Sequence, residues 1–323
     1  MKRRILSIAL VLAMVVSLFA GCTTGNTGTE PSAATTAPDI TSAPVAPADT
    51  TAAGDDFASK LQEIKDNATE DSLQRVLDAG VITAGCEGNW IPFLFYSQED
   101  ADYLTGFDAE VARKVAELLG VEVKFDVASQ FDGILAGLQS KRYDIIAEGL
   151  KKSTVAPFEG LTASTLYHQD MPIIIVAADN TEIVDLASMA GKKAGNSTTS
   201  SYGKIAFNAG CECNPDLDFA MAIQGIINGT IDLTVNSMIV YETYLKNYPE
   251  AADLLKIAFV YEAENPEDLQ GGFTVRSEDA SLLAALNLCL ETLMEQGVIQ
   301  DLSRQFMSDE YTDNSLVFAP YAN

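Results

Sequence analysis

Three charged side chains stand together where a predicted strand ends. The segment AEGLKKST, residues 147–154, follows an apolar run and contains Glu148, Lys151 and Lys152. A carboxylate and an ammonium group three residues apart could bind the two charges of a zwitterion. They could equally pair with each other and touch no ligand, because charged loop residues are commonly solvated. We expect Lys152 to be solvated and leave the choice open for Glu148 and Lys151.

A second carboxylate offers another kind of site. Glu87 ends the predicted strand VITAGCE, which precedes Glu148 along the chain. Together they could hold a cationic group in a cleft that is dry when closed, because charge pairing strengthens at low dielectric constant. A metal site is not indicated, since CEC at 211–213 lacks CxxC spacing and His168 is the only histidine. No cofactor is expected.

Alternating strand and helix patterns predict the sheets that would position these side chains. A helix at 57–79 is followed by strands at 81–87, 121–128 and 143–149, with helices at 106–120 and 131–142 between them. This alternation predicts a parallel sheet with crossover helices. After an extended segment at 171–177, a second unit has strands at 191–196, 230–237 and 256–261 and helices at 200–210, 218–229 and 241–248. The chain returns through 271–277, and two closing helices, 279–296 and 298–307, could pack on either unit.

The strand ends of these units are where a ligand is expected. In open α/β sheets, ligands bind beyond the carboxyl ends of the strands. Five loops follow predicted strands and meet this condition: EGNWIPF, ASQFDG, AEGLKKST, NSTTSS and VNSMIV.

The first 54 residues predict export rather than structure. MKRR precedes an apolar run of 16 residues and the small residues of AGC at 20–22. A spanning helix needs about 20 apolar residues, so residues 1–22 are typical of a secretory signal. Residues 23–54 are mostly Thr, Ala, Pro, Ser and Gly, and we expect a disordered tether because such a segment buries too little apolar surface to order itself. The cysteine after Ala20-Gly21 resembles a bacterial lipobox, which implies lipidation of Cys22.

Charge and cysteine content exclude some classes of function. The net charge is −26, and within residues 1–54 three basic residues balance three acidic ones, so the excess lies on the folded part. A nucleic-acid partner is disfavoured because phosphates need a basic surface. Four further cysteines, Cys86, Cys211, Cys213 and Cys289, allow three pairings, and the sequence does not choose among them. Cys289 falls on the apolar face of a helix and is expected to be buried.

The strand-end loops, in their order, resemble bacterial extracellular solute-binding proteins of family 3. The matching segments are GVITAGCEGNWIPFLF, LTGFDAEVARKVAELLGVEVKF, FDGILAGLQSKRYDIIAEGL, DLASMAGKKAGNSTTSSYGK, IQGIINGTIDLTVNS and LETLMEQGVIQDLSRQF. The resemblance implies a type II periplasmic-binding-protein fold of two α/β lobes joined by two hinge strands. Lobe 1 would comprise 73–170 and 271–312, and lobe 2 would comprise 171–270. Residues 55–72 would form an N-terminal helical segment and 313–323 a tail.

The resemblance also implies a function. The protein would be a monomeric lipoprotein on the extracytoplasmic face of a bacterial membrane, and it would deliver a small polar solute, an amino acid or a similar compound, to an ABC permease and its ATPase. Hinge closure would bury the solute. One alternative is an enzyme on the same scaffold, similar to cyclohexadienyl dehydratase, with Glu148 as general acid. Another is a sensory receptor without a permease. We assign no catalytic residue.

Two charged residues of the family site are absent. The position of the arginine that grips the ligand carboxylate falls on Ala156, and that of the aspartate that takes the ammonium falls on Ser237. The aromatic walls follow the family at Trp90 and Phe131. Asp108 is expected to cap a helix, and His168 is assigned no role. The ligand-binding residues we expect are Glu87, Trp90, Phe131, Glu148, Gly149, Lys151, Thr199, Ser200, Asn236 and Ser237.

Overall fold

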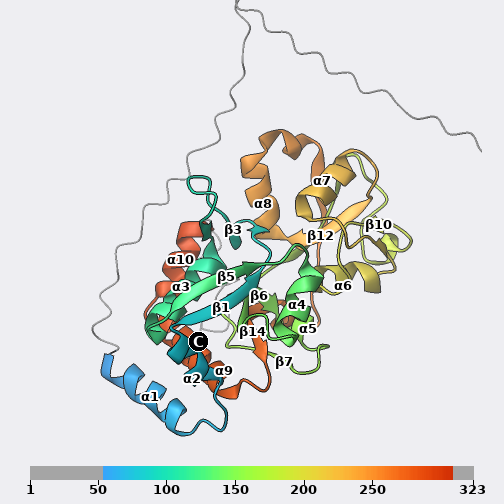
Figure 1. The fold of residues 1–323 in the computed structure, drawn as a ribbon. Helices are drawn as coiled ribbons and strands as arrows, with labels where there is room; N and C mark the ends of the chain where they lie inside the picture. Colours follow the sequence, from blue (N-terminus) through green and yellow to red (C-terminus); the bar gives the residue numbers. More distant parts are fainter. Residues whose placement is uncertain (1–53, 308–323) are drawn as a thin grey trace, which may run out of the picture. The chain divides into compact units, whose positions relative to one another are not determined.

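Two mixed β-sheets with helices packed on them make up the described part of the chain (Figure 1). A computed structural model of the protein describes residues 54–307, all within one compact unit. The signal segment, Cys22, nearly all of the predicted tether and the C-terminal tail lie outside the described residues. Within residues 54–307 no single helix is long and apolar enough to cross a membrane. The consecutive helices α9 (Ala280–Glu295) and α10 (Val298–Phe306) reach that length only jointly, and they meet at 75°.

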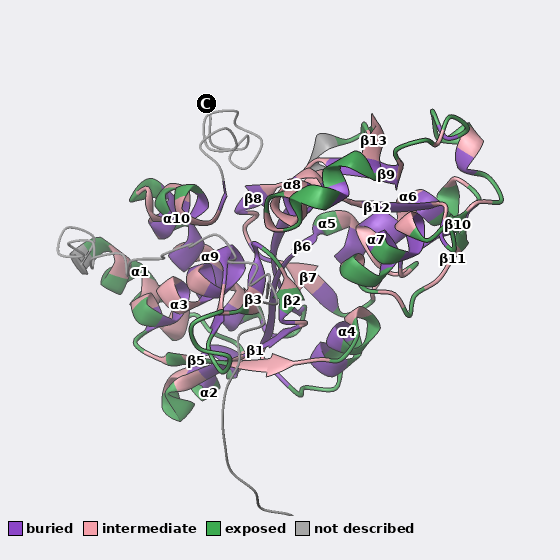
Figure 2. Ribbon diagram, turned by 90° about the horizontal axis from the view of Figure 1, so that it is seen from above, coloured by how far each residue is buried: buried purple, intermediate pink, exposed green. Residues whose placement is uncertain are grey.

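The first sheet has the strand order β5-β1-β6-β14-β7, with β8 paired to β14. Its strands are β1 (Val81–Cys86), β5 (Glu122–Val127), β6 (Ile145–Lys151), β7 (Leu161–Ala163), β8 (His168–Gln169) and β14 (Gln270–Arg276). Strand β1 runs parallel to both β5 and β6, as the alternation predicts. Every residue of β6 and β14 is buried, because helices and loops cover both faces (Figure 2).

Helices α3 (Phe107–Leu119) and α4 (Phe131–Gln139) cross between these parallel strands, and the short α5 (Lys152–Val155) follows β6 directly. Gly120 ends α3 with a positive φ of 71°, and its N–H caps the last turn. A small sheet of β2 (Asn89–Trp90), β3 (Leu94–Tyr96) and β4 (Leu104–Thr105) lies between β1 and α3 in the sequence.

The second sheet has the order β11-β10-β12-β9-β13. Its strands are β9 (Pro172–Ala177), β10 (Lys193–Ala194), β11 (Glu212–Cys213), β12 (Leu233–Ser237) and β13 (Leu255–Val260). Its helices are α6 (Ser201–Asn208), α7 (Phe219–Ile227) and α8 (Met238–Asn247), with 3-10 turns η2 (Ala187–Met189), η3 (Pro249–Asp253) and η4 (Pro266–Leu269). Helix α8 begins three residues earlier than predicted, because Ser237 ends β12 and caps α8 at once.

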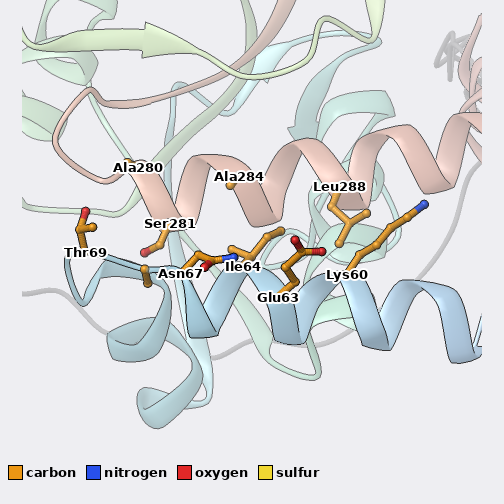
Figure 3. A pocket seen from close by; sticks show the side chains of 10 residues that line it. Lys60, Glu63, Ile64, Asn67, Thr69, Ala280, Ser281, Ala284 and Leu288 are labelled. Atoms are coloured by element: carbon orange, nitrogen blue, oxygen red, sulfur yellow. The ribbon is translucent and has the colours of Figure 1, made fainter.

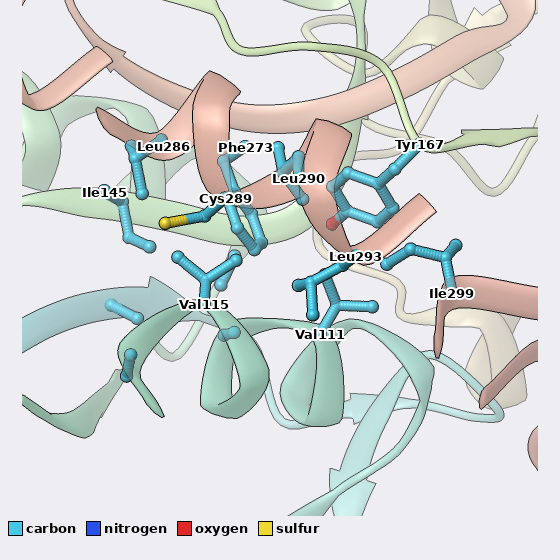
Figure 4. Close-up of a cluster of buried hydrophobic side chains, with 14 of the residues drawn as sticks. Val111, Val115, Ile145, Tyr167, Phe273, Leu286, Cys289, Leu290, Leu293 and Ile299 are labelled. Atoms are coloured by element: carbon cyan, nitrogen blue, oxygen red, sulfur yellow. The ribbon is translucent and has the colours of Figure 1, made fainter. Parts of the chain in front are cut away.

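The closing helices α9 (Ala280–Glu295) and α10 (Val298–Phe306) pack with the first sheet, which settles a choice that the sequence left open. Val111 and Val115 of α3 face Cys289 and Leu293 of α9 in this core (Figure 4). Cys289 is fully buried, which confirms its predicted place as a small apolar side chain.

The predicted helix at 57–79 is wrong as a single element. It divides into α1 (Gly54–Asp66) and α2 (Ser72–Ala79). Between them the Glu70 carboxylate accepts hydrogen bonds from the N–H groups of Ser72 and Ser281, each at 2.6 Å, and so caps both α2 and α9. One carboxylate thus satisfies N–H groups at two helix starts, which stabilises the break between α1 and α2.

The chain crosses between the two sheets at a crowded place. Gly149, with φ 51°, lies against His168, whose Nε2 is 3.1 Å from the Gly149 carbonyl oxygen. A Cβ at Gly149 would lie 1.9 Å from His168 Nε2, and one at Gly271 would lie 2.0 Å from the Gly149 oxygen. Glycine is therefore required at both positions.

Replacing Gly149 by alanine should destabilise the protein by about 2–4 kcal/mol, because a left-handed backbone conformation and a steric clash act together. Gly120→Ala is the matched control: φ is 71° but nothing lies within 4 Å of the added Cβ, so about 1 kcal/mol is expected. Urea unfolding followed by circular dichroism measures both. Equal losses would show that the contact with His168 is unimportant.

Glu70→Gln should lower stability at pH 7 by about 1 kcal/mol, since the capping charge is lost. Its hydrogen bonds with Ser281 and Ser72 outweigh the effect of burial, which alone would raise the pKa of Glu70, and they lower that pKa to about 2. The ionised Glu70 side chain thus contributes fully to folding stability above its usual pKa near 4.5, and this contribution disappears as pH falls towards 2. Urea unfolding at several pH values should show the two proteins converging in acid. The exposed Glu63→Gln should match wild type throughout.

Candidate functional site

Two carboxylates meet at the carboxyl ends of adjacent parallel strands. Strands β1 and β6 pair Gly85 with Ile146, so Glu87 and Glu148 lie side by side two residues further on. The backbone N–H of Glu87 donates a hydrogen bond to Glu148 Oε1. Glu148 is 1% exposed, whereas Glu87 is half-buried. The neighbouring arrangement predicted for this pair is therefore present in the structure.

Their surroundings are acidic. Burial first, and then the charges of Asp218 and Asp132, raise the pKa of Glu87 to about 7. Burial and the neighbouring Glu87 raise the pKa of Glu148 well above its usual value. No ion pair from a lysine or arginine to either carboxylate occurs in residues 54–307. The geometry can therefore accept a cationic group or a proton.

Lys151 is directed elsewhere. Its Nζ lies 3.2 Å from Asp170 Oδ2, and both side chains are almost completely buried. Tyr202 donates a hydrogen bond to Asp170 Oδ2, and Ser237 donates one to Oδ1 at 2.7 Å. The ligand contacts expected for Lys151 and Ser237 stay predictions, and both residues have protein partners in this arrangement. Lys152 is exposed, as expected.

The two predicted aromatic walls lie in different surroundings. Trp90 is half-buried, stacks on Phe93 with ring centroids 4.5 Å apart, and packs against the cores beneath both sheets. Phe131 begins α4, is half-buried, and packs against the core that contains Ile134. Trp90 therefore lies between the sheets, and Phe131 lies on the first sheet's side.

The loop NSTTSS lies against α4. Ser197 Oγ donates a hydrogen bond to Asp132 Oδ1 at 2.9 Å, and Thr199 Oγ1 donates to the same oxygen. Ser200 caps α6 by accepting a hydrogen bond from the Gly203 N–H at 3.0 Å. Ser200 therefore has a structural role at the start of α6, and its expected contact with a ligand stays a prediction. Asn236 is half-buried and accepts a hydrogen bond from the Ser237 N–H at 2.8 Å.

The expectation for Asp108 is wrong. Asp108 lies in the first turn of α3 without capping it, since no side chain caps this helix start. It is fully buried and accepts a hydrogen bond from the Tyr167 hydroxyl at 2.8 Å. Burial, only partly offset by Tyr167 and Lys151, raises the pKa of Asp108 to about 7. The hydrogen bond from the buried Tyr167 hydroxyl explains the position of Asp108 better than capping of α3 does.

His168 has a structural position that the sequence did not indicate. It is buried among Phe93, Phe107 and Tyr167, with ring centroids between 5.4 and 6.1 Å from its own. Burial, together with the charge of Lys151, lowers the pKa of His168 to about 3, so the ring is neutral.

Sequence reasoning missed Asp132, Asp170, Tyr202 and Asp218. Asp132 and Asp218 start helices in the segments FDG and DFA, and this is the ordinary signal of capping. Asp170 and Tyr202 are 32 residues apart, and no local pattern joins them. The structure thus places polar groups at the strand ends that a survey of loops alone did not reveal.

Other possible sites are few in the described part of the chain. No group of three His, Cys, Asp or Glu side chains that could hold a metal occurs there. Cys86, Cys211, Cys213 and Cys289 are all unpaired. A groove of about 460 Å³ lies between α1 and α9, where Ile64 faces Ala284 (Figure 3). None of its lining residues is among those expected to bind ligand.

Known sequences resemble the chain over most of its length. The profile of the bacterial extracellular solute-binding proteins, family 3, matches residues 82–309. The L-cystine-binding protein TcyA of Bacillus subtilis (strain 168) is 32% identical over 254 residues, which cover 78% of this chain and 91% of that protein. A probable amino-acid ABC transporter-binding protein of Haemophilus influenzae is 30% identical over 238 residues, 74% of this chain and 89% of that protein.

Solved structures show the same type II fold. An ancestral arginine-binding protein bound to arginine is 28% identical and superposes with a TM-score of 0.61, covering 70% of this chain and 98% of that one. The L-cystine solute receptor of Neisseria gonorrhoeae, in its unliganded open conformation, is also 28% identical, with a TM-score of 0.50 over 76% of this chain and 99% of that one. The predicted fold class is confirmed.

In ligand-free protein, stability should fall as pH rises from about 4.5 to 7, because the raised pKa of Glu87 means that folding favours its protonated form in this range. Glu87→Gln should flatten this slope by about 1–3 kcal/mol over the interval. Urea unfolding at several pH values measures the effect. The exposed Glu122→Gln should keep the wild-type slope, and an unchanged slope in Glu87→Gln would mean that Glu87 ionises freely in the folded protein.

Proposed function

The chain belongs to the bacterial extracellular solute-binding proteins of family 3, and on that premise we propose that it is the substrate-binding protein of an ABC importer. Its role is to capture a small polar solute and deliver it to a permease driven by an ATPase. The relatives named above are binding proteins, which supports a binding role rather than catalysis. The two lobes are residues 73–170 with 271–312, and residues 171–270, and the solute binds between them.

Closure of the lobes is the second part of the proposal. Contacts join segments of the two lobes at places far apart in the sequence. Besides the Asp132 contacts with Ser197 and Thr199, Lys204 Nζ donates a hydrogen bond to the Ser153 carbonyl oxygen at 2.8 Å. These contacts between the lobes support a closed arrangement. Closure of this kind buries a ligand and makes its release slow.

The solute is an amino acid or a similar compound that carries a cationic group. The observation that carries this choice is the uncompensated pair Glu87 and Glu148 at the strand ends. A carboxylate pair in a dry site gains most from a partner of opposite charge. The proposed site also includes the other residues expected from the sequence: Trp90, Phe131, Gly149, Lys151, Thr199, Ser200, Asn236 and Ser237.

Location follows from the same family. We place the mature protein on the extracytoplasmic face of the membrane, anchored through lipid on Cys22 and acting as a monomer. Radiolabelled palmitate, incorporated into wild type but not into Cys22→Ala, tests the anchor. Label in the variant would contradict it.

A thermal-shift screen identifies the ligand class. Cystine and arginine, the solutes named for relatives, should be compared with lysine, neutral and acidic amino acids, polyamines and sugars. A ligand at 100 times its Kd adds about 2.7 kcal/mol of stability, which is a clear shift. Because Trp90 is the only tryptophan and packs against both cores, its emission should change with every true ligand. If no cationic or zwitterionic solute changes the thermal stability or the Trp90 emission, the proposal is refuted.

Glu148→Gln should weaken binding of the ligand so found at least tenfold, which corresponds to about 1.4 kcal/mol. The amide keeps an oxygen to accept the Glu87 N–H but removes the charge. Titration calorimetry measures the change, with Glu122→Gln as the control of matched chemistry on the exposed face of β5. Equal affinity in Glu148→Gln would remove Glu148 from the site.

A further inference from the structure

Asp170 is a buried carboxylate in the segment that connects the two sheets. It follows β8 of the first sheet and precedes β9 of the second, and its side chain is completely buried. Such a charge is tolerated only when it is paired and hydrogen-bonded, because its removal from water is costly. The partners of Asp170 therefore matter more than those of a surface charge.

The partners come from both sheets. Lys151 ends β6 of the first sheet and contributes the ion pair at 3.2 Å. Tyr202 in α6 and Ser237 at the end of β12 belong to the second sheet's side and donate hydrogen bonds to the two carboxylate oxygens. The Met171 N–H, 2.7 Å from Oδ1, adds a local donor. Asp170 Oδ2 thus accepts a hydrogen bond from Tyr202, and Oδ1 accepts hydrogen bonds from Ser237 and from the Met171 N–H.

Each partner also depends on Asp170. Lys151 Nζ makes no hydrogen bond within residues 54–307, so Asp170 is the acidic group that compensates its charge. The same ammonium lies 5.3 Å from the Tyr202 ring centroid, which joins the two partners directly. Ser237 caps α8 and donates to Asp170, so it ties the start of α8 to the connection. The network therefore joins β6 of the first sheet to α6 and α8 on the second sheet's side.

We propose that Asp170 is a positioning residue that fixes the closed arrangement of the lobes and so raises ligand affinity without touching the ligand. Ser237 stays beside Asp170 when the sheets separate, because Ser237 pairs with Pro172 and the Met238 N–H donates a hydrogen bond to the Met171 carbonyl oxygen. Lys151 belongs to the first sheet, so opening withdraws its ammonium group from the buried Asp170 carboxylate and costs the ion pair. The proposal rests on the proposed function only through the ligand that closure retains.

Tyr202→Phe is the mildest test, because it removes one hydroxyl and keeps the ring. It should raise Kd for the ligand found in the screen three- to tenfold, chiefly through faster dissociation, and should increase the radius of gyration of the ligand-free protein in solution scattering. Asp170→Asn should have the same direction and a larger effect. Asp253→Asn, at an exposed position of η3, is the matched control and should equal wild type in both measurements.

The charge pair gives a second, independent readout. Asp170→Asn leaves the Lys151 ammonium buried without compensation, so adding Lys151→Met should restore part of the lost affinity and compactness. Additive losses in the double variant would contradict the pairing. Lower stability of Tyr202→Phe without change in Kd or radius would reduce Asp170 to a structural role and overturn the proposal. If no solute binds, the proposed function is refuted. The radii of gyration of wild type and the Asp170 and Tyr202 variants still test whether Asp170 positions the lobes.

Discussion

The cost of placing charge in a dry interior governs this protein's functional region. Asp170 meets the cost with an ammonium group and two hydroxyl donors, whereas Glu148, buried to the same degree, has a single backbone N–H and another carboxylate beside it. Burial alone cannot explain the difference, since both side chains are almost inaccessible. The protein itself supplies partners for Asp170, whereas Glu148 lacks a cationic partner within the described residues.

The sheet topology creates this contrast. Parallel strands β1 and β6 end at the same edge, which forces Glu87 and Glu148 together, and the chain then runs through β6 to Lys151. The connection after β8 brings Asp170 to that lysine from another direction. Charge is therefore concentrated at the strand ends, with the pair Glu87 and Glu148 uncompensated and Asp170 compensated by Lys151.

Local patterns predicted the elements well, and long-range contacts explain what they missed. Apolar periodicity and terminal glycines predict helices such as α3 and strands such as β5. The adjacency of Glu87 and Glu148 was also accessible, because parallel neighbours end together. The partners of Asp170 were not, since Ser237 lies 67 residues away and its hydroxyl equally suits a helix cap. The break before α2 was missed because Glu70 depends on the distant Ser281.

The glycines at the crossing have a mechanical meaning. Gly149 and Gly271 bring two backbone segments as near as atoms allow, with the His168 ring filling the remaining space. Segments in such close contact cannot slide past one another, because any shear would drive carbonyl oxygen into carbon. Because these glycines lie in the paired strands β6 and β14, the contact fixes one edge of the first sheet beside the segment that leads through Asp170 to the second sheet.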